Sequence, residues 1–116
     1  MVTPDLGDFV WLDFNPQAGR EQAGHRAALV LTPRRYNAVS GLCVAVPITT
    51  REKGYPFEVP IPNGLAVRGV VLADQLRSMD WRVRRVERIG PAPGELVETV
   101  RAKAAALLNL AVDPSP

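Results

Sequence analysis

The residues that could do chemistry in this sequence are mainly arginines, threonines, glutamates and glutamines. The chain has a single histidine, His25, and a single cysteine, Cys43. One histidine excludes a paired-imidazole acid–base mechanism and a multi-histidine metal site. One cysteine excludes an intrachain disulfide and a cysteine-based zinc site. We therefore expect any catalysis to need no metal ion or cofactor and to use arginine, threonine, glutamate, glutamine and backbone groups.

Two common kinds of catalytic site are disfavoured by the motifs that are missing. Neither a GxxxxGK[ST] loop nor a GxGxxG turn after a strand is present, so a nucleotide cofactor is unsupported. A serine triad can be written from Ser78, His25 and Asp74, but no nucleophile elbow surrounds Ser78. The remaining candidates lie in a long polar loop, residues 16–24, because long ordered loops are often functional.

Positive charge is concentrated locally, although the formal net charge is only +2. Residues 76–90 carry five arginines against two acidic residues. Such a cluster could face phosphate or an acidic protein segment, or it could be an ordinary solvated surface. Composition alone leaves these alternatives open.

The elements that must position these residues are mostly short strands. The runs 27–31 and 42–46 are continuously apolar, which is typical of strands buried on both faces. In the first strand Val10, Leu12 and Phe14 share one apolar side, which should face the core. We predict a helical turn over 34–37, an edge strand over 57–59, and further strands over 9–14, 27–31, 42–46, 67–72, 75–79 and within 81–89.

A helix of period 3.6 is predicted from residue 95 to about residue 110. Its apolar face, expected to be core or interface, consists of Leu96, Val100, Ala104, Leu107 and Leu108. Many short strands followed by one helix predict a mainly β fold, a small, strongly curved antiparallel barrel or half-barrel with a C-terminal helix. At 116 residues the chain fits one domain, residues 1–112, with a short tail over 113–116.

The location expected from the sequence is the cytoplasm. No stretch approaches the roughly 20 apolar residues that span a bilayer. The N-terminus lacks the basic and apolar regions of a signal peptide.

Several segments of the sequence together resemble the MazF/PemK toxin family. Residues 19–31 are similar to its G-x-E-Q-x-G-x-R-P-hydrophobic segment, and residues 7–14 to its G-D opening. Residues 46–50 match its P-x-T segment, and residues 53–59 and 73–81 fit its middle and late motifs. Each fragment is weak alone, but five in the right order cover nearly the whole chain.

The resemblance implies a fold, an activity and partners. Members fold as small SH3-like barrels with a C-terminal helix and form homodimers. They are toxins of type II toxin–antitoxin pairs that cleave single-stranded RNA without metal, leaving 2′,3′-cyclic phosphate and 5′-hydroxyl ends. A MazE-like antitoxin blocks the RNA groove with an extended, acidic segment.

The resemblance also implies roles for individual residues. The catalytic arginine and threonine of the family fall on Arg26 and Thr49, and the motif glutamate falls on Glu21, a plausible general base. The site is then expected where the loop 20–26 faces Thr49, near the subunit boundary. RNA-binding roles are expected for Arg20, Gln22, His25, Thr50, Gln75, Arg77 and Ser78.

This sequence departs from the family pattern at two positions in the loop segment. Arg20 stands where serine is common, and Ala27 stands where proline is usual. The extra charge of Arg20 bears on which RNA sequence is cut, not on the reaction class.

Two other functions compete with RNA cleavage. The first is a non-enzymatic toxin on the same barrel that inhibits a topoisomerase by protein–protein contact. The second is a small-barrel nucleic-acid binder without catalysis, which predicts stacking aromatic residues on a strand face. The sequence argues against this binder because only 6% of residues are aromatic, and Trp11 and Trp81 are expected to be core or dimer contacts.

Overall fold

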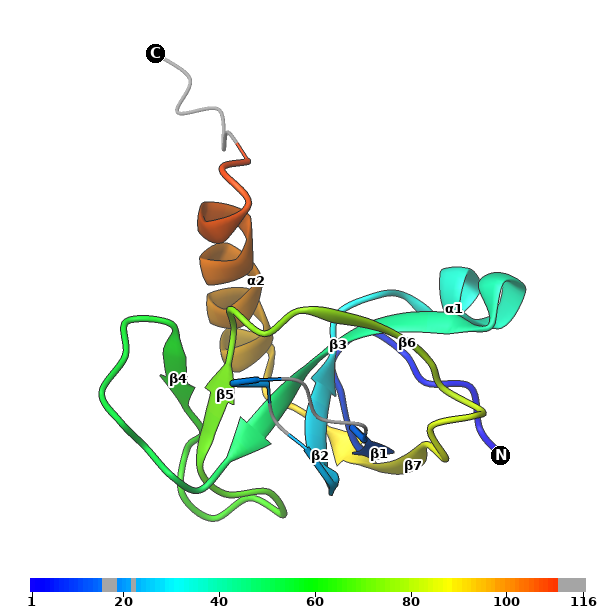
Figure 1. The fold of residues 1–116 in the computed structure, drawn as a ribbon, viewed down its shortest axis with the longest axis horizontal. Coiled ribbons are helices and arrows are strands. Elements are labelled where there is room, and N and C mark those ends of the chain that lie inside the picture. Colours follow the sequence, from blue (N-terminus) through cyan, green and yellow to red (C-terminus); the bar gives the residue numbers. More distant parts are fainter. Residues whose placement is uncertain (16–18, 22, 111–116) are drawn as a thin grey trace.

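The structure, a computed structural model, describes residues 1–15, 19–21 and 23–110. The sheet and both helices are drawn in Figure 1. In chain order the elements are β1 (Asp8–Asp13), β2 (His25–Val30), α1 (Arg34–Ser40), β3 (Leu42–Thr49), β4 (Glu58–Pro60), β5 (Val70–Leu72), β6 (Arg77–Asp80), β7 (Glu87–Pro91) and α2 (Gly94–Leu107).

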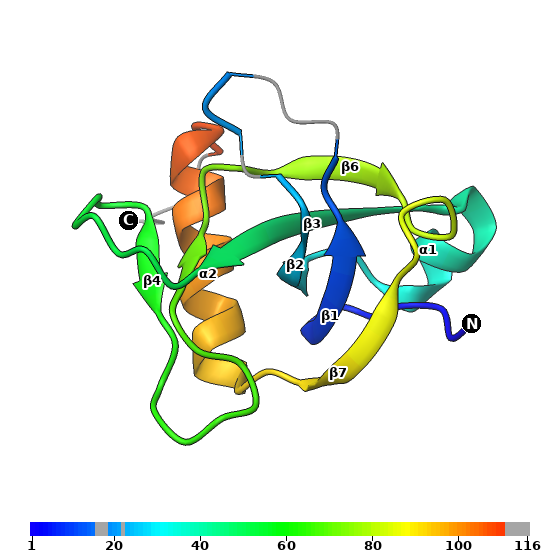
Figure 2. The ribbon, with the colours of Figure 1, turned by 60° about the horizontal axis from the view of Figure 1, so that its bottom comes forward.

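The strands form one curved antiparallel sheet. Its order is β4-β5-β3-β2-β1-β7, and β6 also pairs with β3. Figure 2 shows how the sheet curls on itself while α2 stands beside it. The prediction of a mainly β fold, a small curved antiparallel barrel with a C-terminal helix, is confirmed.

The sheet buries both of its faces, which explains the continuously apolar runs. On β1, Val10 and Leu12 enter one core cluster, which also holds Phe14, Met79 and Trp81. Phe9 points the other way, into a second cluster with residues of α2. Alternate residues of β2 and β3 likewise divide between the two clusters, as strands of period 2 require. The prediction that these strands are buried on both faces is confirmed.

Helix α2 covers the second face of the sheet with its first three turns. Leu96, Val100 and Ala104 are buried there, as predicted. Leu107 and Leu108 are exposed, so of the two expected roles, core or interface, the core role does not hold for them in the single protomer. The reason is that α2 runs past the sheet, as Figure 1 shows, and its last turn has no strand beneath it.

The strand boundaries also differ from the prediction: β3 runs on to Thr49 instead of ending at residue 46, and other strands begin later than expected. The strand expected over 67–72 begins only at Val70, because Gly69 has a φ of +115° that a strand cannot continue through. The strand expected within 81–89 begins at Glu87, since residues 81–85 form a turn after β6. The predicted edge strand is confirmed, because β4 is the first strand of the sheet.

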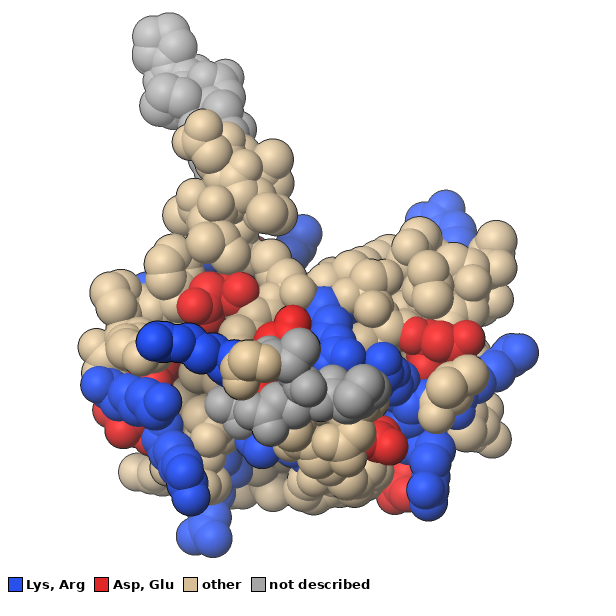
Figure 3. Space-filling view, in the orientation of Figure 1, with Lys and Arg blue, Asp and Glu red and all other residues tan. Residues whose placement is uncertain are grey.

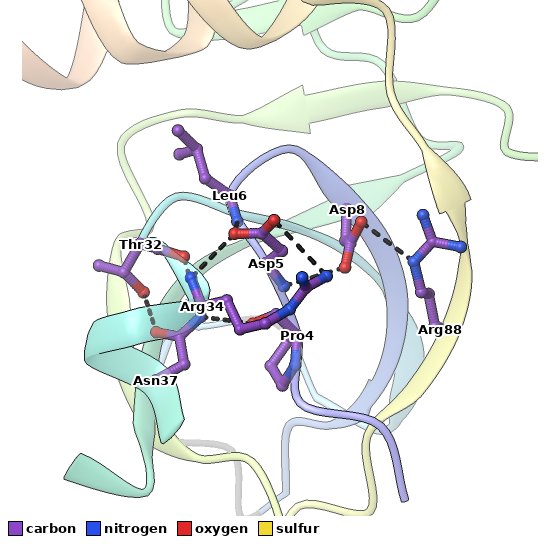
Figure 4. A network of polar contacts seen from close by, with 8 residues as sticks. All are labelled: Pro4, Asp5, Leu6, Asp8, Thr32, Arg34, Asn37 and Arg88. Carbon is purple, nitrogen blue, oxygen red and sulfur yellow. Dashed lines mark hydrogen bonds and ion pairs between the residues drawn. The ribbon is translucent and has the colours of Figure 1, made fainter. Parts of the chain in front are cut away.

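The buried side chain of Asn37 attaches α1 to the barrel. Its amide donates to the carbonyls of Pro4 and Thr32, both at 2.8 Å, and accepts the Thr32 hydroxyl at 2.7 Å (Figure 4). The indole of Trp81 donates to the Asn37 backbone carbonyl at 3.0 Å. All polar groups of the buried amide are thus paired, which is the condition for burying it without a large cost.

Two aspartates beside Asn37 tie the N-terminal segment to α1 and β7. The Asp5 carboxylate accepts the backbone N–H of Arg34 at 2.8 Å, at the start of α1. That hydrogen bond lowers the pKa of Asp5. Asp8 accepts from the Arg88 guanidinium at 3.1 Å (Figure 4).

Neither helix of the described ranges has the length and apolar run that crossing a bilayer takes.

The thiol of Cys43, buried as predicted, leads to an expected dependence of stability on pH. Burial raises its pKa to about 11, from an ordinary value of 9.0. A proton held more tightly by the folded state contributes stability below pH 9 that is lost as pH rises through 11. We expect unfolding free energies of the unmodified protein and Cys43→Ala to converge over this range, by up to about 2–3 kcal/mol.

Denaturant titrations of the two proteins at matched pH measure this convergence. The cavity left by Cys43→Ala adds an offset that does not depend on pH. A difference that stays constant through pH 11 would contradict the prediction.

Candidate active site

An open groove of about 1170 Å³ lies at one end of the barrel. Its walls come from the β1–β2 loop, the start of β2, the end of β3 and the segments 50–55 and 66–68. The described residues that line it include Trp11, Arg20, Glu21, His25, Arg26, Thr49, Thr50, Arg51, Lys53, Tyr55, Glu58, Arg68, Asp74 and Gln75. Most of the predicted site residues therefore meet in one place.

Arg26 is held in this groove by two backbone carbonyls. Its Nε donates to Ala23 at 2.8 Å, and its Nη1 donates to Ile48 at 3.3 Å. Among the described residues it makes no ion pair, so its charge is not neutralised by a carboxylate. Partial burial lowers the pKa of its guanidinium, which still carries its proton and its charge in the groove. The remaining N–H groups form a fork suited to phosphate oxygens.

Thr49 lies at the end of β3, directly after the carbonyl that Arg26 contacts. Its side-chain oxygen accepts the backbone N–H of Arg51 at 3.1 Å. This bond fixes the hydroxyl while leaving its proton available to donate to a phosphate oxygen. Behind Thr49 the chain passes so closely that a Cβ on Gly69 would lie 2.2 Å from the Thr49 carbonyl oxygen.

A buried carboxylate, Glu58, shapes the part of the groove wall that the segment 50–55 forms. It accepts backbone N–H groups from Lys53, Gly54 and Tyr55, at distances from 2.8 to 3.3 Å. These bonds fold the segment 53–55 around one side chain of β4. The sequence places Glu58 in an edge strand and in the segment 53–59 that resembles the family's middle motif, but neither feature predicts this role.

The groove is rich in positive charge. Five described lysine and arginine residues line it against three carboxylates. Figure 3 shows basic side chains gathered over the end of the molecule where β4 and β5 lie. Arg20 and Arg26 were expected near this site, whereas Arg51, Lys53 and Arg68 were not, because no predicted role was attached to these three positions.

The predicted site residues fall in different places. Glu21, His25, Thr50 and Gln75 line the groove with Arg26 and Thr49. Arg77 lines a smaller adjoining cavity of about 210 Å³, to which Glu21 and Gln75 also contribute. Ser78 is exposed on β6 and lines neither cavity. The predicted RNA-binding residue Gln22 lies outside the described residues.

Trp11 is not a core residue. It is 41% exposed and lines the groove, whereas Trp81 is 1% exposed, as expected for the core. The Trp11 ring stacks on the ring of His25, with centroids 5.8 Å apart and planes 19° from parallel. A strand pattern could not separate the two tryptophans, because Trp11 occupies a sheet position that α2 leaves uncovered.

Most arginine side chains of the segment 76–90 contact other parts of the same chain. Nη1 of Arg77 donates to the Phe14 carbonyl at 3.0 Å, and Arg88 pairs with Asp8. Nη1 of Arg84 donates to the carbonyls of Asp13 and Asn15. These contacts favour a structural role for much of the cluster over a phosphate-binding surface.

Arg84 therefore holds the beginning of the loop that carries Arg20 and Glu21. The beginning of this loop is joined to its end by Asn15, whose side chain accepts the Gly24 N–H at 3.0 Å. We expect Arg84→Met to lower the rate of the reaction in the groove roughly tenfold, since small displacements of catalytic groups reduce the rate strongly. The mutation should also speed tryptic cleavage after Arg20.

Arg82→Met is the matched control for this prediction. Arg82 lies over the Trp81 ring, 4.8 Å from its centroid, and its side chain makes no hydrogen bond or ion pair with the described residues of the β1–β2 loop. A loss in Arg82→Met equal to that in Arg84→Met would show that the loop contact is not the cause.

The comparison with known protein families decides which family this site belongs to. Residues 5–108 match the profile of a family described as "PemK-like, MazF-like toxin of type II toxin-antitoxin system". The match includes every described residue that lines the groove, and it covers helix α1 and α2 to its last residue, Leu107. The chain belongs to this family.

Individual relatives of this PemK/MazF-family chain are similar over nearly its whole length. "Endoribonuclease toxin MazF" of Escherichia coli (strain K12) is 48% identical over 106 residues, 91% of this chain and 95% of the relative. The crystal structure of MazF from Deinococcus radiodurans has 55% identity and a TM-score of 0.92, covering 95% of this chain and all of that one. A MazE–MazF structure from the same organism has 54% identity and a TM-score of 0.86, covering 96% and 100%.

Proposed function

We propose that this chain is an endoribonuclease toxin of a type II toxin–antitoxin system that cleaves single-stranded RNA without metal. The observation that carries the proposal is the arrangement of Arg26 and Thr49. The guanidinium is anchored by the Ile48 carbonyl beside Thr49, in a groove rich in positive charge. The names of the relatives, endoribonucleases MazF, ChpB and PemK, support the same activity.

The proposed reaction is an intramolecular attack within the RNA. The 2′-hydroxyl oxygen attacks the adjacent phosphorus and loses its proton, while the bond to the 5′-oxygen breaks and that oxygen gains a proton. The products are a 2′,3′-cyclic phosphate and a 5′-hydroxyl. Because the nucleophile is already attached to the substrate, the enzyme has to align it, move protons and stabilise the phosphate charge.

Three groove residues divide these tasks. Arg26 binds the non-bridging phosphate oxygens and stabilises their added charge in the transition state. The Thr49 hydroxyl donates to a phosphate oxygen. Glu21 takes the proton of the 2′-hydroxyl.

The proposal includes partners and a location. A MazF from Deinococcus radiodurans has been crystallised with MazE, and by extension this chain takes a MazE-like antitoxin. An extended acidic segment of that partner fits the basic groove and would exclude RNA. The chain acts as a homodimer in the cytoplasm, and the exposed leucines at the end of α2 offer a surface for the second protomer.

The test is incubation of purified, antitoxin-free protein with a long single-stranded RNA in the presence of EDTA. We expect cuts at a short sequence motif, mapped to single nucleotides, with cyclic phosphate ends. RNA that is retarded in a gel but not cut would replace the proposal with a non-catalytic binder. RNA that is neither bound nor cut by folded protein would favour a toxin that blocks a topoisomerase.

A further inference from the structure

We propose that Trp11 and His25 form a stacking platform for one base of the RNA. The inference rests on the proposed function, and it specifies how the groove contacts its substrate beyond the phosphate group. It also assigns a binding role to Trp11, which the sequence placed among core or dimer contacts.

The two rings are brought together by the pairing of β1 and β2. Trp11 is opposite Ala27, and Asp13 is opposite His25, so Trp11 and His25 are diagonal neighbours on adjacent strands. The small side chain of Ala27 leaves room beside the indole. The rings are nearly parallel, with planes 19° apart and centroids separated by 5.8 Å.

The exposure of Trp11 is the second argument. A tryptophan is among the largest apolar side chains, and the other tryptophan of the chain is almost completely buried. Trp11 is left 41% exposed on the wall of a groove, with its ring already held in one orientation by His25. A fixed, exposed aromatic face in a basic groove is the arrangement that single-stranded nucleic-acid binders use for bases.

The groove relates the platform to the phosphate-binding group. Arg26 leaves β2 on the opposite side from His25, yet Arg26 and both rings line the same groove at the start of the strand. A phosphate and the base of its nucleotide are separated by one sugar, so RNA held at Arg26 has a neighbouring base within reach of the rings. Base-paired RNA presents no free base face, which gives the groove a reason to select single strands.

The test combines protein variants with oligonucleotides that lack single bases. The probe is a single-stranded RNA carrying the motif mapped in the cleavage assay, with 2′-deoxyribose at the cut position so that it cannot react. A series of the same oligonucleotide has one base at a time removed, leaving the phosphates intact. Dissociation constants are measured by fluorescence anisotropy of an oligonucleotide that carries a dye at its end, a signal that does not depend on Trp11. Tryptophan quenching is followed in the unmodified protein, where the buried Trp81 should contribute little change.

We expect quenching on binding and a dissociation constant about 5- to 150-fold higher for Trp11→Leu. Trp11→Phe, which keeps a ring, should recover most of the affinity. Removing the base at one position should weaken binding to the unmodified protein by the same factor. It should cause no further loss of affinity in Trp11→Leu, because both changes remove the same contact. Tyr36→Leu is the matched control, since Tyr36 is a similarly exposed aromatic residue on α1 that does not line the groove.

The proposal would be overturned if the affinity loss from the missing base and the loss from Trp11→Leu added together at every abasic position. A normal dissociation constant in Trp11→Leu would overturn it as well. The proposal would also be overturned if Trp11→Leu changed the oligomeric state of the protein while each abasic oligonucleotide lost the same affinity as before. Trp11 would then be a contact between subunits. If the protein cuts no RNA, the series is repeated on a mixed-sequence RNA. Stacking without cleavage then refutes the proposed function alone, and cleavage without stacking refutes only this inference.

Discussion

Replacing Arg26 by alanine should lower the rate of RNA cleavage by about 10²–10³-fold, the effect of removing one preorganised charge-stabilising donor. The guanidinium is positioned by the carbonyls of Ala23 and Ile48, so its N–H groups do not have to reorganise when charge develops on the phosphate. The rate should be measured in single turnovers at saturating RNA. Under these conditions the change reports the chemical step rather than binding.

Two further variants separate the geometry of Arg26 from its charge. Arg26→Lys keeps a cation but loses the planar fork, so we expect it to recover only a small part of the rate. Arg35→Ala removes an exposed arginine of α1, outside the groove, and should cleave like the unmodified protein. Circular dichroism confirms folding of each variant. A folded Arg26→Ala protein with a nearly normal rate would remove this residue from the mechanism.

Replacing Gly69 by alanine should both destabilise the protein and impair cleavage. The new Cβ would lie 2.2 Å from the Thr49 carbonyl oxygen, a backbone atom, so the chain itself has to move. The φ of +115° adds backbone strain for any residue with a side chain. We expect a loss of about 3 kcal/mol or more in the free energy of unfolding, measured by denaturant titration.

Gly64→Ala is the matched control for this prediction. Gly64 is in the same β4–β5 connection and also has a positive φ, +88°, but a Cβ there would meet nothing within 4 Å. This control should lose only about 1–2 kcal/mol and keep its cleavage rate. Since Gly69 packs on Thr49, Gly69→Ala should in addition cleave more slowly at temperatures where it is fully folded. Equal rates for the two variants would show that the close approach does not position Thr49.

The architecture could be predicted from the sequence because the apolar pattern of each strand indicates which of its faces are buried. Continuous apolar runs such as residues 27–31 require a sheet covered on both faces, and the C-terminal helix supplies the second cover. The point along the helix at which it stops covering the sheet could not be predicted. Leu107 and Leu108 continue the helical period, but the length of the sheet beneath them is a tertiary property.

The site was predictable only where its residues lie in recognisable motifs. Arg26 and Thr49 were identified from two such segments, and the β2–β3 pairing brings them to the same groove. Arg68 lies in a connection without a motif, and it reaches the groove because Gly69 allows that connection to pass close to Thr49. Glu58 looked like an ordinary edge-strand residue, since its partners are backbone N–H groups that the sequence does not display.

The pairing of β3 with three strands has a consequence for local opening of the barrel. β3 hydrogen-bonds to β2, β5 and β6, whereas the edge strand β4 pairs only with β5 among the described strands. Amide hydrogens of β3 should therefore exchange with solvent last and those of β4 early, because edge elements open at lower free energy. Opening of β4 would free Glu58 and the basic segment that it holds, while Thr49 and the carbonyl that anchors Arg26 stay in the protected strand. The groove can thus widen around an incoming RNA while its reactive floor stays folded.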